Sequence, residues 1–247
     1  MALDVLRVGS GPPVVLVHGS IVGGERTWRH QLVLAERWSL VIPDRPGFGA
    51  SPPLERGDFE AEAPLIADLL GDGAHLVGHS YGAVIALLAA ALRPESVLSL
   101  TVSEPGALGV AAGHPAVDRM RADGDRLYDA GLDPRDFLLM FRSGVSSSHE
   151  TPDELPEWLE RGARHARDER PPWEADVPLD RLAAAPYPAL VISGGHSEAF
   201  EVVCDTIAGT IGAEREVIAG RGHTIPATGA PYNERLDRFL RAAAAAR

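Results

Sequence analysis

The sequence predicts an α/β fold with a mostly parallel, doubly wound sheet and a helical insertion before the last strands. Three observations predict this fold. Short β-branched runs alternate with longer helix-forming segments, most of these runs are continuously apolar, and the alternation stops over one long stretch. Strand–helix alternation implies right-handed crossovers between parallel strands, and continuous apolar runs suit strands that are buried on both faces.

The predicted strands are short and rich in Val, Ile and Leu. They occupy residues 14–17, 40–42, 75–77, 98–102, 190–192 and 215–218. Helix-forming stretches lie at residues 25–37, 60–70, 81–92, 199–211 and 231–246. Residues 3–8 precede a turn-forming run from Gly9 to Pro13, so we expect them to form an antiparallel edge strand.

The alternation breaks between about residues 111 and 185. This stretch contains helical pieces at 115–129, 134–142 and 152–167, which are separated by Pro, Gly and the polar run Ser146-Ser147-Ser148. An ordinary crossover is much shorter. Since ligands of open α/β sheets bind at the carboxyl ends of the strands, we expect a cap over that edge. The predicted domains are a core (residues 1–110 and 186–247) and a helical cap (residues 111–185).

Composition narrows the classes of function. The formal net charge is −12, which disfavours binding to nucleic acid or to an anionic membrane. All 23 basic residues are Arg, so a Schiff-base or phosphate-loop lysine is excluded. Cys204 is the single cysteine, so neither an internal disulfide nor a cysteine metal cluster can form. No signal peptide or membrane span is recognisable, so we expect a cytoplasmic protein. We expect it to be a monomer or a homodimer.

The most informative motif is Gly78-His79-Ser80-Tyr81-Gly82. It lies between a predicted strand and a helix-forming run that contains no Gly or Pro. A serine at the apex of a strand–turn–helix is typical of a nucleophile elbow, whose tight turn requires residues that are almost free of side chain on either side. We therefore predict that Ser80 is a nucleophile.

A serine nucleophile needs a base and donors for an oxyanion. His223 alone among the nine histidines lies in a Gly-rich loop after the last predicted strand, so it is the predicted base. The oxyanion donors are predicted to be the backbone N–H groups of Tyr81, at the start of a helix, and Ser20, in the loop after the strand at 14–17. His18 and His79 are expected to make local hydrogen bonds beside the site.

Four motifs together resemble the α/β-hydrolase superfamily. They are His18-Gly19, the stretch from Asp44 to Ser51 (Asp-Arg-Pro-Gly-Phe-Gly-Ala-Ser), the elbow at 78–82 and Gly222-His223. They occur in the family's order and span most of the chain outside the cap. The resemblance implies a serine hydrolase, with the Asp44 stretch as a structural loop beside the site.

The chain departs from the family pattern at the triad acid. The usual aspartate would fall at Ser197, in the loop from Ser193 to Glu198. Three possibilities follow: Glu198 supplies the acid, no acid exists, or the acid lies elsewhere. Glu104 follows the strand at 98–102, beside the nucleophile's strand. This position resembles that of the triad acid in some family members, such as zearalenone-type lactone hydrolases. A glutamate buried at this position, in a chain without lysine, would need a partner that a histidine N–H can supply. We predict a Ser80–His223–Glu104 triad.

The predicted reaction is cleavage of a small or medium carboxylic ester or lactone through an acyl-enzyme on Ser80. No metal or cofactor is expected, and the expected partner is a small apolar substrate. Trp173, between two prolines and the acidic Glu174, is expected to line the pocket, whereas Trp28 is expected to serve packing. Two alternatives stay open: C–C bond hydrolysis or another reaction on the same triad, and a ligand-binding protein that retains it.

Overall fold

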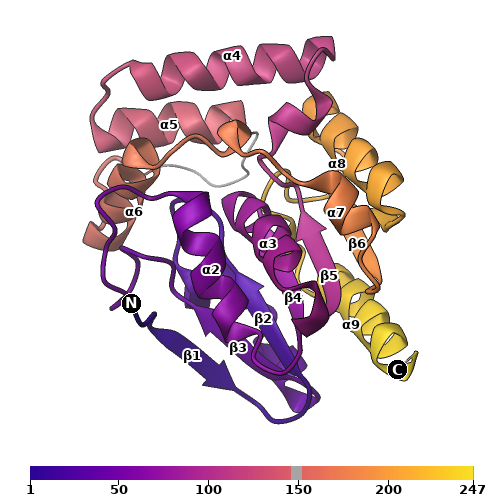
Figure 1. Cartoon of the computed structure of the whole chain (residues 1–247). Helices are drawn as coiled ribbons and strands as arrows, with labels where there is room; N and C mark the ends of the chain where they lie inside the picture. Colours follow the sequence, from indigo (N-terminus) through magenta and orange to yellow (C-terminus); the bar gives the residue numbers. More distant parts are fainter. Residues whose placement is uncertain (146–151, 247) are drawn as a thin grey trace.

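Seven strands form one sheet in the computed structural model, which describes residues 1–145 and 152–246 (Figure 1). The order across the sheet is β1-β3-β2-β4-β5-β6-β7. The strands are β1 (Val5–Val8), β2 (Pro13–Val17), β3 (Ser39–Pro43), β4 (Ala74–His79), β5 (Val97–Ser103), β6 (Ala189–Ser193) and β7 (Glu214–Val217). Only β1 pairs in an antiparallel manner, with β3; the other pairs are parallel. The predicted edge strand and parallel sheet are therefore confirmed.

Helices cover both faces of the sheet. They are α1 (Gly24–Thr27), α2 (Phe59–Leu69), α3 (Tyr81–Leu92), α7 (Leu179–Ala183), α8 (Glu198–Ile211) and α9 (Ala230–Ala245), with 3-10 turns η1 (Leu32–Glu36), η2 (Pro94–Ser96), η3 (Leu108–Ala111), η4 (Pro172–Glu174) and η5 (Ile225–Thr228). Alternate strand residues serve opposite faces. Val15 and Val17 join the core beneath α2, α3 and α8, whereas Val14 and Leu16 join the core beneath α9. Both faces are thus buried, which explains the continuous apolar runs.

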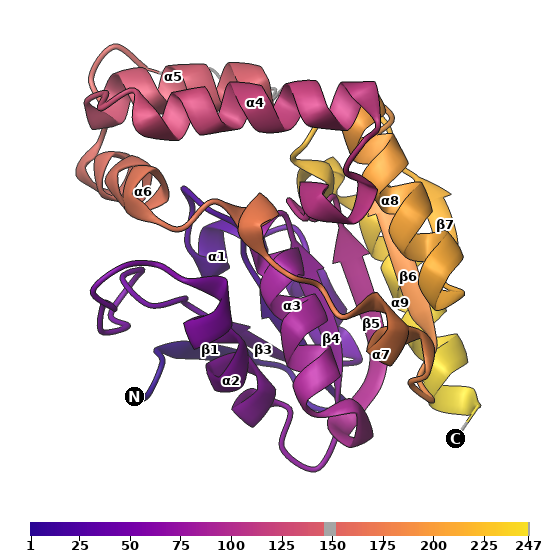
Figure 2. The same ribbon diagram turned by 45° about the horizontal axis from the view of Figure 1, so that its top comes forward.

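Three helices inserted between β5 and β6 lie over the end of the sheet toward which β5 points (Figures 1 and 2). They are α4 (Pro115–Asp129), α5 (Pro134–Gly144) and α6 (Glu157–Asp168). Their shared core contains Phe137, Leu138 and Leu159, and Ile21 of the loop after β2 joins it. This core attaches the inserted helices to the edge of the sheet where the candidate site lies.

The helix expected at residues 152–167 begins only at Glu157. Pro156 precedes it in an extended conformation, with φ −61° and ψ 149°. A proline lacks the N–H that an earlier turn would need, so the helix starts after it. The polar run Ser146-Ser147-Ser148 lies outside the described residues.

The prediction of a single helix at residues 25–37 is wrong. The chain forms the short helix α1 and then the 3-10 turn η1 instead. Between them, the Gln31 amide donates hydrogen bonds to the Pro226 carbonyl and to the Asn233 side chain, and the Trp28 ring is fully buried. These tertiary contacts outweigh a weak local preference for helix.

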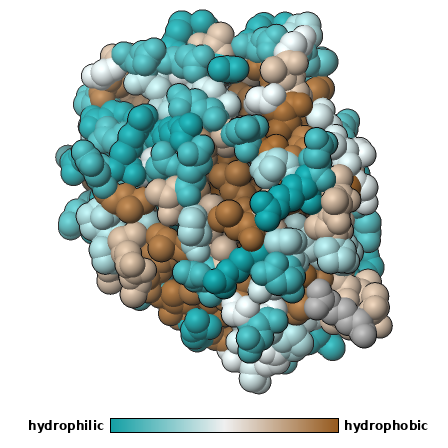
Figure 3. All heavy atoms as spheres, viewed as in Figure 1, coloured by the Kyte–Doolittle hydropathy of each residue, from teal (hydrophilic) through white to brown (hydrophobic). Residues whose placement is uncertain are grey.

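The outer surface of the inserted helices is largely polar. Helix α4 buries only Ala116 and Val117, and many residues over α4 and α5 are hydrophilic in Figure 3. Helix α5 exposes Leu139 and Met140. None of the helices in the described residues is long and apolar enough to cross a membrane.

Candidate active site

Ser80 lies at the apex of the turn between β4 and α3. Its backbone has φ 56° and ψ −121°, which is strained for a residue with a side chain. A Cβ on Gly78 would lie 2.5 Å from the carbonyl oxygen of Gly82, and a Cβ on Gly82 would overlap the carbonyl oxygens of Val17 and His18. Both glycines of the motif are therefore required by close backbone approach.

His223 follows β7 and lies within hydrogen-bond distance of the serine. Its Nε2 is 2.8 Å from Ser80 Oγ, so a neutral imidazole accepts the hydroxyl proton there. The ring stacks on Phe200 with centroids 4.7 Å apart. His79 Nε2–H donates to the His223 carbonyl at 2.8 Å. Burial, and to a smaller extent the charge of the nearby His223, lowers the pKa of His79 to about 4. A neutral His79 thus holds the loop that carries His223.

Glu104 completes the hydrogen-bonded line. It is fully buried directly after β5, and its Oε2 lies 2.6 Å from His223 Nδ1. Its other oxygen, Oε1, accepts the Gly194 N–H at 2.7 Å and lies 3.2 Å from His196 Nδ1. Burial by itself would raise the pKa of Glu104, but the contacts with His196 and His223 outweigh it and lower the pKa to about 2. The carboxylate is therefore ionised next to His223.

The late loop donates to this acid. Gly194 and His196 of this loop both approach Glu104. Ser197 lies just before α8, and Glu198 is the exposed first residue of that helix. Within the described residues Glu198 forms no hydrogen bond or ion pair with His223. His196 also donates from Nε2 to the carbonyl of Val145, just after α5, at 3.2 Å. No pattern in the local sequence pointed to this role of His196.

Ser20 and Tyr81 both lie next to Ser80. A Cβ on Gly19 would lie 3.0 Å from Ser80 Cβ, which places the loop after β2 against the elbow. Tyr81 is the first residue of α3. In the part of the chain that the structure describes, neither the Ser20 N–H nor the Tyr81 N–H has a protein acceptor. Two such N–H groups beside a nucleophile can hold a developing negative charge.

Two cavities meet at Ser80. The smaller measures about 290 Å³ and the larger about 740 Å³, and both are lined by Ser20, Ser80 and His223. Arg26 and Trp158 contribute to the smaller cavity. Volumes of this order suit small-molecule ligands. In the described residues, no cluster of three or more His, Cys, Asp or Glu side chains could hold a metal ion.

The structure places Trp173 on the wall of the larger cavity. Its indole N–H donates to Asp125 at 2.7 Å, and its ring meets Tyr128 edge to face. Trp28 is fully buried and lies 6.4 Å from the ring of Tyr232, so its expected packing role is confirmed.

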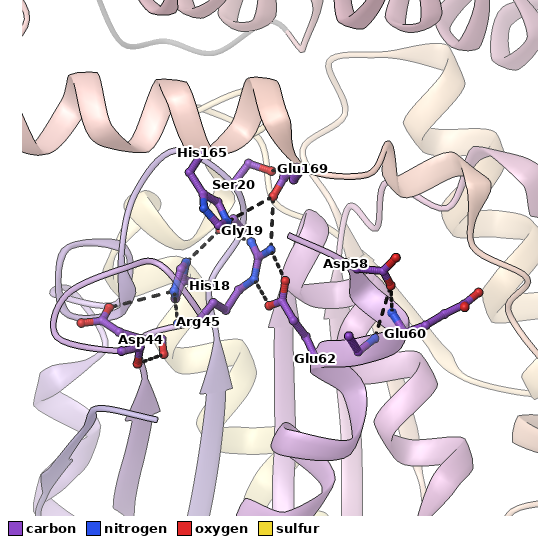
Figure 4. Close-up of polar contacts among 12 residues, drawn as sticks. His18, Gly19, Ser20, Asp44, Arg45, Asp58, Glu60, Glu62, His165 and Glu169 are labelled. Carbon is purple, nitrogen blue, oxygen red and sulfur yellow. Dashed lines mark hydrogen bonds and ion pairs between the residues drawn. The ribbon is translucent and has the colours of Figure 1, made fainter. Parts of the chain in front are cut away.

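A buried ionic cluster lies beside the site and was not predicted from the sequence (Figure 4). Arg45, with no exposed surface, bonds Glu62 of α2 through two hydrogen bonds, at 2.7 Å and 3.0 Å. It also bonds Glu169, just after α6, at 3.2 Å and the carbonyl of Gly19 at 2.9 Å. Arg45 lies within the Asp44 motif, which could have signalled it, whereas nothing in the local sequence marks Glu169.

Comparison with known proteins agrees with this fold. The model of the alpha/beta hydrolase family matches residues 14–242. The chain is 34% identical over 195 residues to a pimeloyl-(acyl-carrier protein) methyl ester esterase of Methylococcus capsulatus, covering 74% of this chain and 70% of the relative. An enzyme of the same name from Chromobacterium violaceum is 41% identical over 102 residues, which are 41% of this chain and 40% of the relative.

A solved structure is also similar over nearly the whole chain. An alpha/beta hydrolase from Sphaerobacter thermophilus superimposes with a TM-score of 0.70 and 26% sequence identity, and the match covers 96% of each chain. The family resemblance and fold class expected from the four motifs are thereby confirmed. The chain belongs to the alpha/beta hydrolase family.

Proposed function

We propose that this ester hydrolase of the alpha/beta hydrolase family cleaves small or medium carboxylic esters, lactones included, through an acyl-enzyme on Ser80. The observation that carries the proposal is the unbroken line from Ser80 Oγ through His223 to Glu104, with contacts of 2.8 Å and 2.6 Å. Nucleophile, base and orienting acid are the three parts that this chemistry requires. The relatives named methyl ester esterases support a carboxylic ester as the substrate class.

The reaction proceeds in two halves. His223 Nε2 takes the Ser80 proton while Oγ attacks the carbonyl carbon, and the resulting oxyanion is held by the N–H groups of Ser20 and Tyr81. The ester C–O bond then breaks, and the leaving alkoxide receives the proton from His223. A water molecule, deprotonated by His223, attacks the acyl carbon and releases the acid and Ser80. Glu104 keeps the Nδ1 proton in place and stabilises the imidazolium in both halves.

The cap would enclose the reacting ester. We assign residues 1–110 and 186–247 to the core and residues 111–185 to a cap that closes over the site. Trp173 and Trp158 would face the two sides of the ester from the larger and the smaller cavity. The substrate's size would then be limited by these cavities.

Hydrolysis of p-nitrophenyl esters from acetate to decanoate, together with γ- and δ-lactones, tests the proposal. The wild-type chain should hydrolyse part of this panel, and Ser80→Ala should lose the activity. A fluorophosphonate should label Ser80, as identified by peptide mass spectrometry. Labelling of Ser80 without turnover of any ester or lactone would contradict the substrate class. An unlabelled Ser80 would contradict a serine nucleophile altogether.

A further inference from the structure

The direction of the Ser20 N–H is set by the carbonyl group on the same peptide. Gly19 C=O accepts hydrogen bonds from His18 Nδ1–H at 2.8 Å and from the Arg45 guanidinium at 2.9 Å. His18 Nε2 in turn accepts the Arg45 N–H at 2.9 Å, so the ring proton is on Nδ1. Since a peptide unit is planar and trans, fixing the Gly19 oxygen also fixes the Ser20 N–H, which points the opposite way.

Arg45 also contacts the second oxyanion donor. Its guanidinium carbon lies 4.1 Å from the centre of the Tyr81 ring, which is buried beneath it. A cation over an aromatic face is an attractive contact, and it is stronger away from water. One side chain therefore contacts both the peptide group that carries the Ser20 N–H and the ring of Tyr81.

The inserted helices supply the last member of this cluster. Glu169 caps the end of α6, accepts a hydrogen bond from the Ser20 hydroxyl and bonds Arg45 (Figure 4). A Cβ on Gly162 of α6 would overlap the carbonyl of Ile21, so the helix rests directly on the same loop. The loop from Gly19 to Ile21 is thus held from the core by Arg45 and from the cap by Glu169.

Stability alone does not account for this arrangement. Glu62 and Glu169 surround one guanidinium, so two carboxyl groups and one positive charge are buried together. Buried ion pairs are commonly no more stable than apolar side chains of similar volume, because desolvation offsets the attraction. The cluster contacts Gly19, Ser20 and Tyr81, and these contacts suggest a role in positioning the site.

We propose that Arg45 and Glu169 are positioning residues of the oxyanion hole, which is complete only when the cap segment ending at Glu169 is docked on the core. This inference rests on the proposed function. It makes cap docking a condition for transition-state stabilisation, in addition to any role of the cap in enclosing the substrate.

The test compares Glu169→Gln, Ser20→Ala and their double variant with Arg170→Gln. Glutamine keeps the size of Glu169 but cannot accept equally from Ser20 and Arg45. Ser20→Ala removes the hydroxyl and keeps the backbone N–H. Arg170 forms ion pairs from the cap to Asp58 and Glu60 of the core and has no contact with Gly19, Ser20 or Tyr81 among the described residues. It is therefore the matched control for loss of a charged contact between the cap and the core, because its partly exposed ion pairs are too weak for their loss to undock the cap.

Each preparation is titrated with a fluorophosphonate, so that rates refer to reactive Ser80. On p-nitrophenyl butyrate, Glu169→Gln and Ser20→Ala should each lower kcat by roughly tenfold with KM nearly unchanged. Removal of a whole oxyanion donor lowers kcat by about 10²–10³-fold, and these variants only misplace one. The rate constant for fluorophosphonate labelling should fall in parallel. The double variant should lose about as much as either single one, because both break the same contact. Arg170→Gln should match the wild type.

Three outcomes would overturn the inference: wild-type kcat in Glu169→Gln, a change confined to KM, or an equal loss in Arg170→Gln. If Glu169→Gln does not fold, Ser20→Ala decides by the same criteria. A wild-type chain whose Ser80 is not labelled overturns the proposed function, and this inference with it. An active wild type, an inactive Ser80→Ala and a fully active Glu169→Gln overturn the inference alone.

Discussion

Glu104 and His223 stand 119 positions apart in the chain, and their side chains meet at 2.6 Å between Oε2 and Nδ1. Sheet register explains why the acid can occupy this place. His79 of β4 pairs with Ser103 of β5, so the next residues, Ser80 and Glu104, emerge side by side at the same edge. An acid after β5 can therefore serve the same histidine that an acid after β6 would serve.

Replacing Glu104 by Gln should lower kcat by roughly 10³-fold or more while the fold is retained. The amide cannot stabilise the imidazolium of His223, and loss of a triad carboxylate has an effect of this size. Glu198→Gln should keep activity within about twofold of the wild type, because Glu198 is exposed and forms no hydrogen bond or ion pair with His223 in the described residues. Steady-state hydrolysis of an ester, with circular dichroism to check folding, measures both. The reverse pattern would assign the acid to Glu198.

His196 should titrate above pH 6.5 in the wild type. Its Nε2–H donates to the carbonyl of Val145, and its Nδ1 lies 3.2 Å from Glu104, which raises the pKa of His196. The stability from this contact is therefore present below pH 6.5 and is lost as the pH rises through the raised pKa. An NMR titration of the His196 ring should show this inflection, and it should move down in Glu104→Gln. An inflection at or below pH 6.5 in the wild type would contradict the contact.

Glu169→Gln should remove a pH dependence from the free energy of unfolding. Burial raises the pKa of Glu169 to about 7, against the partial compensation by Arg45. The groups around it are Arg45, Ser20, Glu62, His165, Tyr128 and the Arg56 guanidinium on its carbonyl. The folded state retains this proton where the unfolded chain has lost it, so the wild type loses stability as the pH rises from about 4.5 to 7.

The free energy of unfolding of the variant, relative to that of the wild type, should therefore rise by about 2 kcal/mol between pH 5 and pH 8. Urea unfolding at several pH values measures it, and Arg170→Gln is again the control. A difference that does not change with pH would show that Glu169 titrates in the folded state as it does in the unfolded chain.

Gly82→Ala should destabilise the protein by at least about 2 kcal/mol. A Cβ there overlaps the backbone carbonyls of Val17 and His18, which cannot move without displacing β2 and the loop after it. Gly209→Ala is the matched control, since Gly209 lies in α8 with nothing within 4 Å of an added Cβ. That variant should gain about 0.5–1 kcal/mol, because alanine favours a helix over glycine. Urea denaturation compares the two. Equal effects would mean that the elbow tolerates a side chain at position 82.

Local patterns in the sequence determined the elements that build the fold and part of the candidate site. Strand–helix alternation predicted the parallel sheet, and the elbow at 78–82 and the Gly-rich loop at His223 predicted which side chains come together. These signals are local, because tight turns need glycine and buried strands need continuous apolar residues. The same reasoning failed at residues 25–37, where the buried Trp28 and Gln31 override the preference for helix.

Tertiary structure alone decided how Glu104 is held and what surrounds the N–H groups of Ser20 and Tyr81. The sequence favoured Glu104 over two alternatives, but only the register of β4 and β5 brings it beside Ser80 and within 2.6 Å of His223. Glu169 and Arg45 are 124 positions apart, and His196 meets Glu104 from another loop. Such contacts join side chains from segments whose spacing carries no information about distance. The contact between Arg45 and Glu169 forms only when the inserted helices pack on the core, and no local pattern of residues encodes that packing.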